Sequence, residues 1–322
     1  MNIKFSVILS LLGKVGDRFA AYGEAQTTAD LFQLASQVNG LDGVELIYPF
    51  EFRDVEEVKG LLGTHSLECS SVNVNVKAEP KFHRGSFTSI DPEVRAEAVR
   101  YLKTGMDLAA SLGCHLVTIC PLADGHDYPF EVDYGQAWRW LREGIGEAAS
   151  YRSDVRVSLE YKRSETRTHC ILNSAATALH LINQIGSPNL GVTIDLGHAL
   201  YVAETPAQIV ALLADADRLF LVHVNDNYRE FDWDMIPGTV NFWDWLETFL
   251  YLDEVGYDGW YTSDVTPARL DPLRVADITA KSVRDAWLFL DKIGRDELRR
   301  LIEAGDSLET LAYVQDRLLE SS

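Results

Sequence analysis

Cysteine, basic charge and long apolar runs are all scarce in this sequence. Only four of the 322 residues are cysteine and none forms a C-x-x-C pair, so neither a disulfide framework nor a thiolate metal site is expected. Acids outnumber bases by 49 to 29, and a net charge of -20 disfavours nucleic-acid binding. No apolar run approaches the roughly 20 residues of a membrane helix, and the N-terminus has no signal-peptide pattern. We therefore predict a cytoplasmic protein with buried reduced thiols and neither a nucleic-acid nor a membrane partner.

The apolar residues are arranged in eight strand-like runs, each followed by a helical pattern. The runs cover residues 4–12, 43–48, 69–76, 115–119, 155–161, 190–195, 219–224 and 259–264. Most are continuous rather than alternating, which is typical of parallel strands buried on both faces. Eight such units predict an α/β fold, a TIM (β/α)8 barrel. We assign residues 1–294 to the catalytic barrel and residues 295–322 to a C-terminal helical appendage.

Acids and a histidine stand at the ends of the last four runs, where the chemistry of such barrels takes place. Glu160 lies near the end of the fifth run, Asp195 ends the sixth, His223 lies in the seventh and Asp264 ends the eighth. Three carboxylates brought together without a cation would raise one another's pKa. Three carboxylates and an imidazole suit a fairly hard divalent cation, so we predict a site for Mn²⁺, with Mg²⁺ or Co²⁺ as alternatives.

A second set of ligands, His198, Asp232 and Asp234, could hold a second ion, with Asp195 as a bridge. Each feature has a simpler interpretation: an Asp after a strand often caps the next helix, and a histidine on an apolar strand is often a core residue. We favour the metal interpretation because acid or imidazole occurs at the same end of four consecutive runs.

This pattern resembles the xylose isomerase-like TIM barrels, and within them the two-metal aldose–ketose isomerases such as L-rhamnose isomerase and xylose isomerase. The E-x-K motif of the fifth strand corresponds to Glu160 and Lys162. The acid-x-x-His motif of the sixth corresponds to Asp195 and His198. The resemblance covers residues 155–267, and the first half of the chain shares only the βα rhythm.

The remaining motifs complete the comparison. His223 matches the strand-seven ligand of the rhamnose isomerases, where xylose isomerase has an acid, and Asp264 matches the strand-eight acid. Asp232 and Asp234 match the D-x-D loop. The family's early-loop histidine has no clear counterpart, and His83 is the candidate for it.

The resemblance implies a divalent-metal-dependent isomerase acting on a small free monosaccharide, with one or two ions per subunit and a homo-oligomeric assembly. Hydrogen would move between C1 and C2 by a metal-assisted hydride shift, or through a cis-enediol after proton abstraction. Lys162 would donate to the O1 side, and Glu160, His198 and Asp232 would be the other catalytic groups.

Substrate contacts are expected from Trp233, His83 and Asn75, and Trp233 stands between two of the proposed ligands. Other aromatic candidates, for which helix-to-barrel packing is the simpler interpretation, are Tyr128, Phe130, Phe242 and Trp243.

Three other functions fit parts of the pattern. A sugar or cyclitol 3-epimerase of the same superfamily would use a single metal between two glutamates, whereas this chain has the shorter Asp264 and adds Lys162. An endonuclease IV-like enzyme would need more histidine ligands and a basic face. The third alternative is a non-catalytic sugar-binding barrel, which predicts that metal removal leaves ligand binding unchanged.

Overall fold

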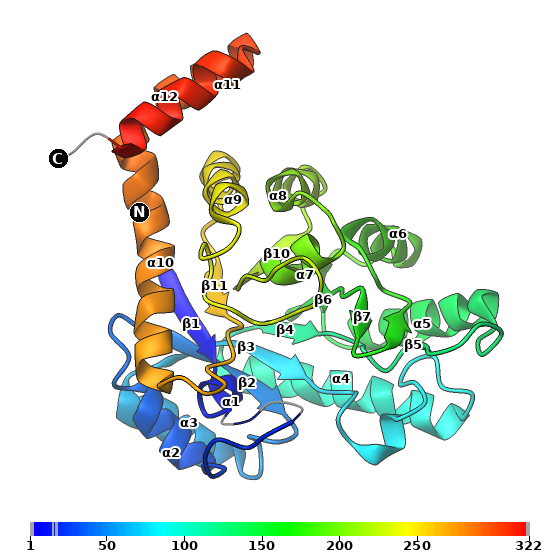
Figure 1. Cartoon of the computed structure of the whole chain (residues 1–322). Helices are drawn as coiled ribbons and strands as arrows, with labels where there is room; N and C mark the ends of the chain where they lie inside the picture. The colour runs from blue at the N-terminus through cyan, green and yellow to red at the C-terminus, as the bar shows by residue number, and fades with distance from the viewer. Residues whose placement is uncertain (1–2, 15, 17–18, 320–322) are drawn as a thin grey trace.

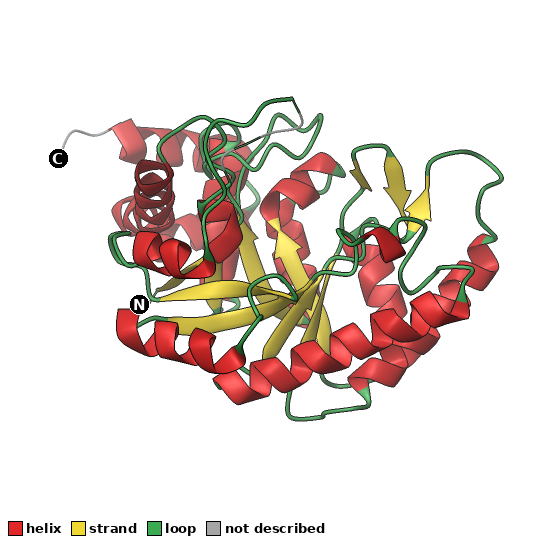
Figure 2. Ribbon diagram, turned by 90° about the horizontal axis from the view of Figure 1, so that it is seen from below, coloured by secondary structure: helices red, strands yellow, loops and turns green. Residues whose placement is uncertain are grey.

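Eight parallel strands close into a barrel in the computed structural model, which describes residues 3–14, 16 and 19–319 (Figures 1 and 2). In barrel order the strands are β1 (Lys4–Ile8), β2 (Gly43–Tyr48), β3 (Glu68–Val74), β4 (Leu116–Ile119), β6 (Arg156–Glu160), β9 (Leu190–Asp195), β10 (Leu219–Val224) and β11 (Trp260–Ser263). The barrel closes where β1 pairs with β11, with Phe5 opposite Tyr261. The predicted (β/α)8 fold is therefore confirmed.

Helices surround the barrel, as Figure 2 shows. The main ones are α2 (Thr28–Ala35), α3 (Val55–His65), α4 (Pro92–Leu112), α5 (Tyr134–Ala149), α6 (Ala175–Ile185), α8 (Pro206–Asp215), α9 (Phe242–Glu254) and α10 (Pro272–Ile293). Local sequence sets their starts. Asp91, for example, accepts the backbone N–H of Glu93 at 2.8 Å, and Pro92 follows at the first helical position.

The barrel interior is lined in part by short hydroxyl side chains rather than by bulky apolar ones. Thr118 and Thr193 lie 2.8 Å apart, Ser158 lies 2.7 Å from Thr193, and Ser6 lies 2.8 Å from Thr262, all between Oγ atoms. Because these buried hydroxyls pair with one another, they satisfy their hydrogen bonds inside the barrel. They also leave the interior polar just below the strand ends that carry the acids.

Several short elements depart from the expected pattern. The first run was expected to continue to residue 12, but its strand ends at Ile8 and a short helix follows, α1 (Leu9–Leu12). A helix α7 (Leu196–Tyr201) and a 3₁₀ turn η1 (Pro80–Phe82) also occur within predicted loops. A small antiparallel sheet flanks the barrel mouth, formed by β5 (Gly125–His126), β8 (Thr168–Cys170) and β7 (Ser164–Glu165). Elements of two to six residues carry too little periodicity to be recognised.

Helices α11 (Arg295–Ala304) and α12 (Ser307–Leu319) lie within the range predicted as a helical appendage. Both project beyond the barrel (Figure 1). Leu298 and Leu301 are buried, and Arg299 forms ion pairs with Asp253 and Glu254 at the end of α9. The division at residue 294 stays a prediction. None of the described helices is both long and apolar enough to cross a membrane. All four cysteines are free thiols, and Cys69, Cys120 and Cys170 are buried, as expected.

Candidate metal centre and active-site cavity

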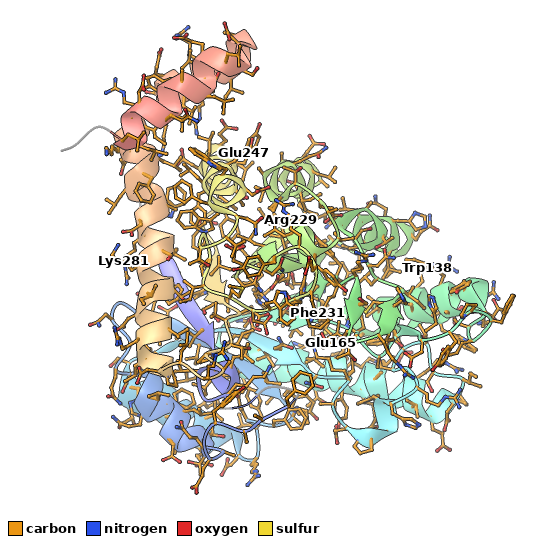
Figure 3. All side chains as sticks on the ribbon, in the orientation of Figure 1. Trp138, Glu165, Arg229, Phe231, Glu247 and Lys281 are labelled. Atoms are coloured by element: carbon orange, nitrogen blue, oxygen red, sulfur yellow. The ribbon has the colours of Figure 1, made fainter. Side chains whose placement is uncertain are left out.

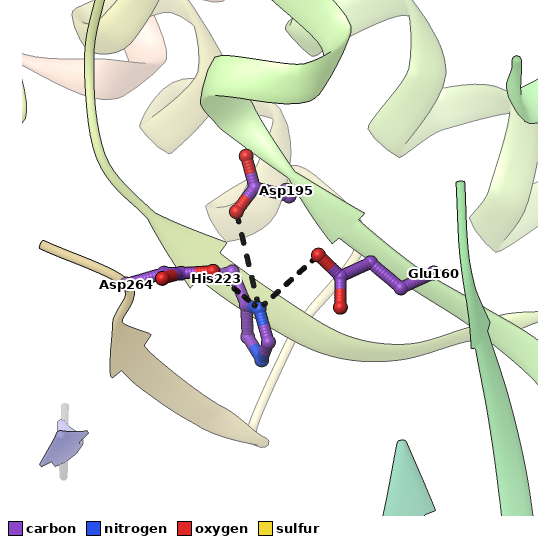
Figure 4. A group of neighbouring side chains, drawn as sticks. All are labelled: Glu160, Asp195, His223 and Asp264. Atoms are coloured by element: carbon purple, nitrogen blue, oxygen red, sulfur yellow. Dashed lines mark ion pairs between the residues drawn. The ribbon is translucent and has the colours of Figure 1, made fainter. Parts of the chain in front are cut away.

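Four side chains from neighbouring strands converge at the mouth of the barrel. Glu160 ends β6, Asp195 ends β9, His223 lies near the end of β10 and Asp264 follows β11. One ligand atom of each lies within 4.8 Å of the corresponding atom of every other. Figure 4 shows the three carboxylates arranged around Nδ1 of His223, at 3.9 Å for Glu160, 3.9 Å for Asp195 and 3.5 Å for Asp264. The structure thus brings together the first predicted ligand set.

The orientation of His223 is set by a residue that the sequence analysis missed. Oε2 of Glu45, on β2, lies 3.2 Å from Nε2 of His223, and both residues are fully buried. The Glu45 carboxylate also accepts hydrogen bonds from Ser71 at 2.5 Å and Asn73 at 2.8 Å. Because this carboxylate is an acceptor, the proton of the neutral ring belongs on Nε2 and the lone pair on Nδ1.

Nδ1 of His223 is buried without a hydrogen-bond partner. A buried nitrogen that faces three carboxylates without a hydrogen bond to any of them is costly unless something fills the space between them. A divalent cation with carboxylate and imidazole ligands would do so. The residues present therefore fit a divalent metal ion.

A second ligand group shares Asp195 with the first. Asp195 caps α7, since its Oδ1 accepts the backbone N–H of His198 at 2.8 Å, and this spacing brings the His198 ring beside it. Ligand atoms of Asp195, His198 and Asp232 lie within 4.8 Å of one another. His198 Nε2 is 3.2 Å from Asp232, and its Nδ1 is 3.1 Å from Glu160. Asp195 could therefore bridge two ions.

Asn225, which follows β10, supports Asp195 from behind. Its Nδ2 donates to Asp195 Oδ2 at 3.0 Å, and its Oδ1 accepts from the backbone N–H of Gly197 at 2.6 Å. A Cβ on Gly197 would lie 2.5 Å from that Oδ1, so glycine is needed for this close approach. The sequence showed Asn225 directly after a predicted ligand strand, but nothing in it indicated the contact.

Lys162 is buried against the second group, with only 7% of its surface exposed. Its Nζ lies 2.7 Å from Asp232 Oδ2 and also forms an ion pair with Glu165. Burial opposes the charged form of Lys162, but the charges of Asp232 and Glu165 outweigh it and raise the pKa of the ammonium. Lys162 is therefore a fixed positive charge beside the second ligand group.

The pKa values of two carboxylates of the centre, Asp195 and Glu160, are shifted in opposite directions. Burial, reinforced by repulsion from Asp264 and Asp232, raises the pKa of Asp195 to about 7. Burial also opposes ionisation of Glu160, but the hydrogen bond from His198 and the charge of His223 outweigh it and lower its pKa to about 2. A divalent cation would offset both the burial and the repulsion that raise the pKa of Asp195, and so favour its ionised form.

Residues of both groups line a cavity of about 1010 Å³. They are Glu160 and Asp264 from the first group and His198 and Asp232 from the second, and Lys162 also lines it. Glu165, on β7, and Phe231, on the loop after β10, also line it, and both are labelled in Figure 3. Residues of both candidate ligand groups and a buried lysine therefore face one shared space.

The three predicted substrate-binding residues all line this cavity. Trp233 is half-exposed and packs edge-on against Phe231, with ring centroids 5.1 Å apart. Asn75 is buried, and its Oδ1 accepts the backbone N–H groups of Lys77 and Ala78, so the side chain holds a turn. His83 is exposed, and its Nδ1 lies 2.6 Å from the carbonyl oxygen of Pro80.

Other predicted residues lie differently. Asp234 lines the cavity, but among the described residues it joins neither ligand group, and it accepts a hydrogen bond from Thr266 at 3.0 Å. Phe242 packs against Trp245 and Phe289 in the helical layer, as the simpler interpretation held. The aromatic candidates absent from the cavity wall are Tyr128, Phe130, Phe242 and Trp243.

Residues 32–292 match the family described as xylose isomerase-like TIM barrel. The chain belongs to this family. It is 29% identical over 211 residues to the xylose isomerase of Thermus thermophilus, a match that covers 64% of this chain and 54% of that protein. The xylose isomerase of Thermus caldophilus matches at 29% over 214 residues with the same coverage. The chain thus spans about half the length of the curated relatives it matches.

Several solved structures share the architecture across most of their length. A D-tagatose 3-epimerase-like protein superposes with a TM-score of 0.72 at 19% identity, covering 90% of this chain and 98% of that one. A D-allulose 3-epimerase from Methylomonas sp. gives 0.68 at 20%, covering 88% and 97%, and an L-ribulose 3-epimerase gives 0.67 at 18%, covering 95% and 99%. At these identities the likeness shows the fold.

Proposed function

We propose that this protein is a divalent-metal-dependent sugar isomerase that interconverts an aldose and its 2-ketose. The observation that carries the proposal is that Lys162 lies buried against a second ligand group, Asp195, His198 and Asp232, which shares Asp195 with the first. A single-metal enzyme has no need of the second group. Resemblance to xylose isomerases in Thermus supports the same reaction class.

The residues of the chain have separate parts in this reaction. Glu160, Asp195, His223 and Asp264 would hold one ion, and Asp195, His198 and Asp232 the other, with Mn²⁺ the preferred metal. Divalent ions supply positive charge that polarises a sugar carbonyl and orients neighbouring hydroxyls. Lys162, whose Nζ lies beside Asp232, would donate a hydrogen bond to the oxygen on C1 as negative charge develops there. Hydrogen then passes between C1 and C2.

The alternative is a ketose 3-epimerase that uses the first ligand group alone. It is favoured by the fold likeness to proteins named as 3-epimerases of tagatose, allulose and ribulose. In such an enzyme two carboxylates would remove and return a proton at C3. Glu160 and Asp264 are the candidates here, on β6 and after β11.

A sugar panel in D₂O separates the two reactions. The metal-free protein, prepared with EDTA, is reloaded with Mn²⁺ and incubated with aldoses and ketoses, and the products are followed by NMR. An isomerase that works by hydride shift produces the ketose without solvent deuterium at C1 or C2. An epimerase produces the C3 epimer with deuterium at C3. Deuterium at C1 or C2 of an interconverted sugar would instead indicate an enediol.

Interconversion that needs no metal would contradict the proposal, as would C3 exchange in place of aldose–ketose conversion. Sugar binding that persists unchanged in EDTA without turnover would favour a non-catalytic binding barrel.

A further inference from the structure

Three cationic side chains line the cavity without forming an ion pair with any carboxylate of the described residues. Lys14, Lys77 and Arg269 all belong to its wall. Across the described ranges 3–14, 16 and 19–319, no acidic oxygen lies within ion-pair distance of any of them, whereas Lys162 in the same cavity contacts two acids. Unpaired cations in a concave site of a protein with a net charge of -20 call for an explanation.

The three cations come from one side of the barrel. Lys14 follows β1 and α1, Lys77 follows β3, and Arg269 lies on the loop after β11. The strands β11, β1, β2 and β3 are consecutive in the barrel, so these loops form one arc of its mouth. The second ligand group and Lys162 come from β6, β9 and the loop after β10, on the opposite arc.

Two of the three loops are held in place by buried or partly buried contacts. Asn75 Oδ1 accepts the backbone N–H of Lys77 at 3.1 Å, which fixes the turn that carries this lysine. On the β11 side, Thr266 donates its backbone N–H to the carbonyl oxygen of Asp234 at 3.0 Å and its hydroxyl to the Asp234 carboxyl at 3.0 Å. The segment leading to Arg269 is thereby tied to the loop of the second ligand group.

The acids of the cavity are already engaged by other groups. Glu160, Asp264 and Asp232 belong to the two ligand groups, Glu165 pairs with Lys162, and Asp234 accepts the hydroxyl hydrogen bond of Thr266. When divalent ions occupy those groups, the carboxylates are neutralised on the side of the metals. The charge of the three unpaired cations then remains for a ligand.

The size of the cavity leaves room for such a ligand. Its volume of about 1010 Å³ lies at the upper end of the roughly 300–1,000 Å³ that holds drug-sized molecules. A sugar whose carbonyl end lies at Lys162 and His198 can therefore extend across the mouth to the arc that carries Lys14 and Arg269.

We propose that the substrate is a monosaccharide bearing an anionic group, a phosphate ester or a carboxylate, at the end of its carbon chain remote from the carbonyl, where Lys14, Lys77 and Arg269 bind it. This inference rests on the proposed isomerase function and narrows it from the neutral free sugar expected from the resemblance. Arg269 offers a planar fork of donors for paired oxygens, and the lysines add compact charges.

Binding of sugar alcohols tests the anion site separately from the reaction, because these ligands have no carbonyl and cannot be isomerised. The Mn²⁺-loaded protein is titrated in a calorimeter with xylitol and sorbitol, with xylitol 5-phosphate and sorbitol 6-phosphate, and with xylonate and gluconate. We expect the phosphate esters or the aldonates to bind at least about tenfold more tightly than the neutral parents. Comparison of the polyol phosphates with the aldonates shows whether the site prefers a phosphate ester or a carboxylate. Equal affinity for charged and neutral members would overturn the inference.

Variants exclude binding of the anion to the metal ions themselves. Lys14→Gln, Lys77→Gln and Arg269→Gln should each reduce the preference for the charged ligand severalfold and leave the affinity for the neutral parent unchanged. Arg84→Gln removes the same charge from an exposed residue outside the cavity wall and serves as the matched control. A preference that survives in all three cavity variants would overturn the inference.

Turnover reports on the proposed function by itself. Suppose that charged polyols bind tightly and that the cavity variants lose this preference, but that no aldose is converted. The isomerase proposal then fails while the anion site stands. If neutral aldoses are converted, and charged aldoses have neither a higher affinity nor a higher kcat/KM than the neutral ones, the anion site fails while the isomerase proposal stands.

Discussion

Glu45 and His223 face each other inside the barrel, with Oε2 3.2 Å from Nε2, although they lie 178 residues apart in the chain. The contact turns Nδ1 of the imidazole toward Glu160, Asp195 and Asp264. A carboxylate behind a ligand histidine fixes the tautomer and increases the basicity of the ligand nitrogen.

Replacing Glu45 should therefore weaken metal binding without removing a ligand. Glu45→Gln keeps the shape of the side chain, and we expect the affinity for Mn²⁺ to fall about 10- to 100-fold in calorimetry. Glu51→Gln is the control, because Glu51 is another buried glutamate near the end of β2 but makes no hydrogen bond to a ligand residue. Unchanged Mn²⁺ affinity in Glu45→Gln would show that Glu45 has only a packing role.

Metal stoichiometry should depend on which ligand group is altered. Asp195 belongs to both groups and Asp232 only to the second. Asp195→Asn should lower binding at both positions, whereas Asp232→Asn should remove one ion and leave the other, since an amide is a weaker ligand than a carboxylate. Elemental analysis after dialysis against a fixed Mn²⁺ concentration measures the bound ions per chain. The same stoichiometry in the two variants would argue against a shared ligand.

Lys162 should matter for turnover more than for metal content. Lys162→Met keeps the aliphatic length but removes the charge that lies 2.7 Å from Asp232. We expect kcat for aldose–ketose conversion to fall about 10²- to 10³-fold, as for other donors to a developing oxyanion. Lys162→Ala should behave alike. Bound Mn²⁺, measured in parallel, should stay at the wild-type level, and its loss together with activity would show that Lys162 has a structural role.

Glu51 should make the stability of the metal-free protein depend on pH. Burial, opposed by the hydrogen bond from the backbone N–H of Ile47, raises the pKa of Glu51 from 4.5 to about 8. The unfolded chain releases this proton at a lower pH than the folded protein does. The stability contributed by protonated Glu51 is thus complete below about pH 4.5 and is lost as the pH rises to about 8, by roughly 1.4 kcal/mol per pH unit.

Urea denaturation in EDTA near pH 5 and near pH 8 checks this dependence. Wild-type protein should lose more free energy of unfolding between the two conditions than Glu51→Gln, which is neutral throughout. Parallel pH profiles for the two proteins would show that Glu51 does not hold its proton in the folded state.

Sequence periodicity was sufficient for the larger elements of the fold. Continuous apolar runs marked all eight barrel strands, and a helical pattern followed each of them. The antiparallel sheet of β5, β7 and β8 was missed because strands of two or three residues have no readable period. Helix α7 was missed for the same reason, although its cap, Asp195, had been singled out as a metal ligand.

The convergence of the candidate ligand residues was predictable because they stand at strand ends, and in a parallel barrel all strand ends of one kind meet at one rim. Glu45 was overlooked because it looks like a polar interruption of the apolar run 43–48, with no sign of the side chain that it would meet. Its role depends on His223, which is distant in the sequence, and the spacing of residues along one strand cannot indicate such a partner.

The sequence by itself determined which residue types stand at the end of each strand, and hence that acids, imidazoles and a lysine would gather at one rim. Only the tertiary structure decided how they meet. Closure of β1 on β11 brings Lys14 and Arg269 onto neighbouring loops, and the placement of β2 and β10 turns Glu45 toward His223. The physical reason is that charge and periodicity are properties of local sequence, whereas the distance between two side chains depends on how the whole barrel closes.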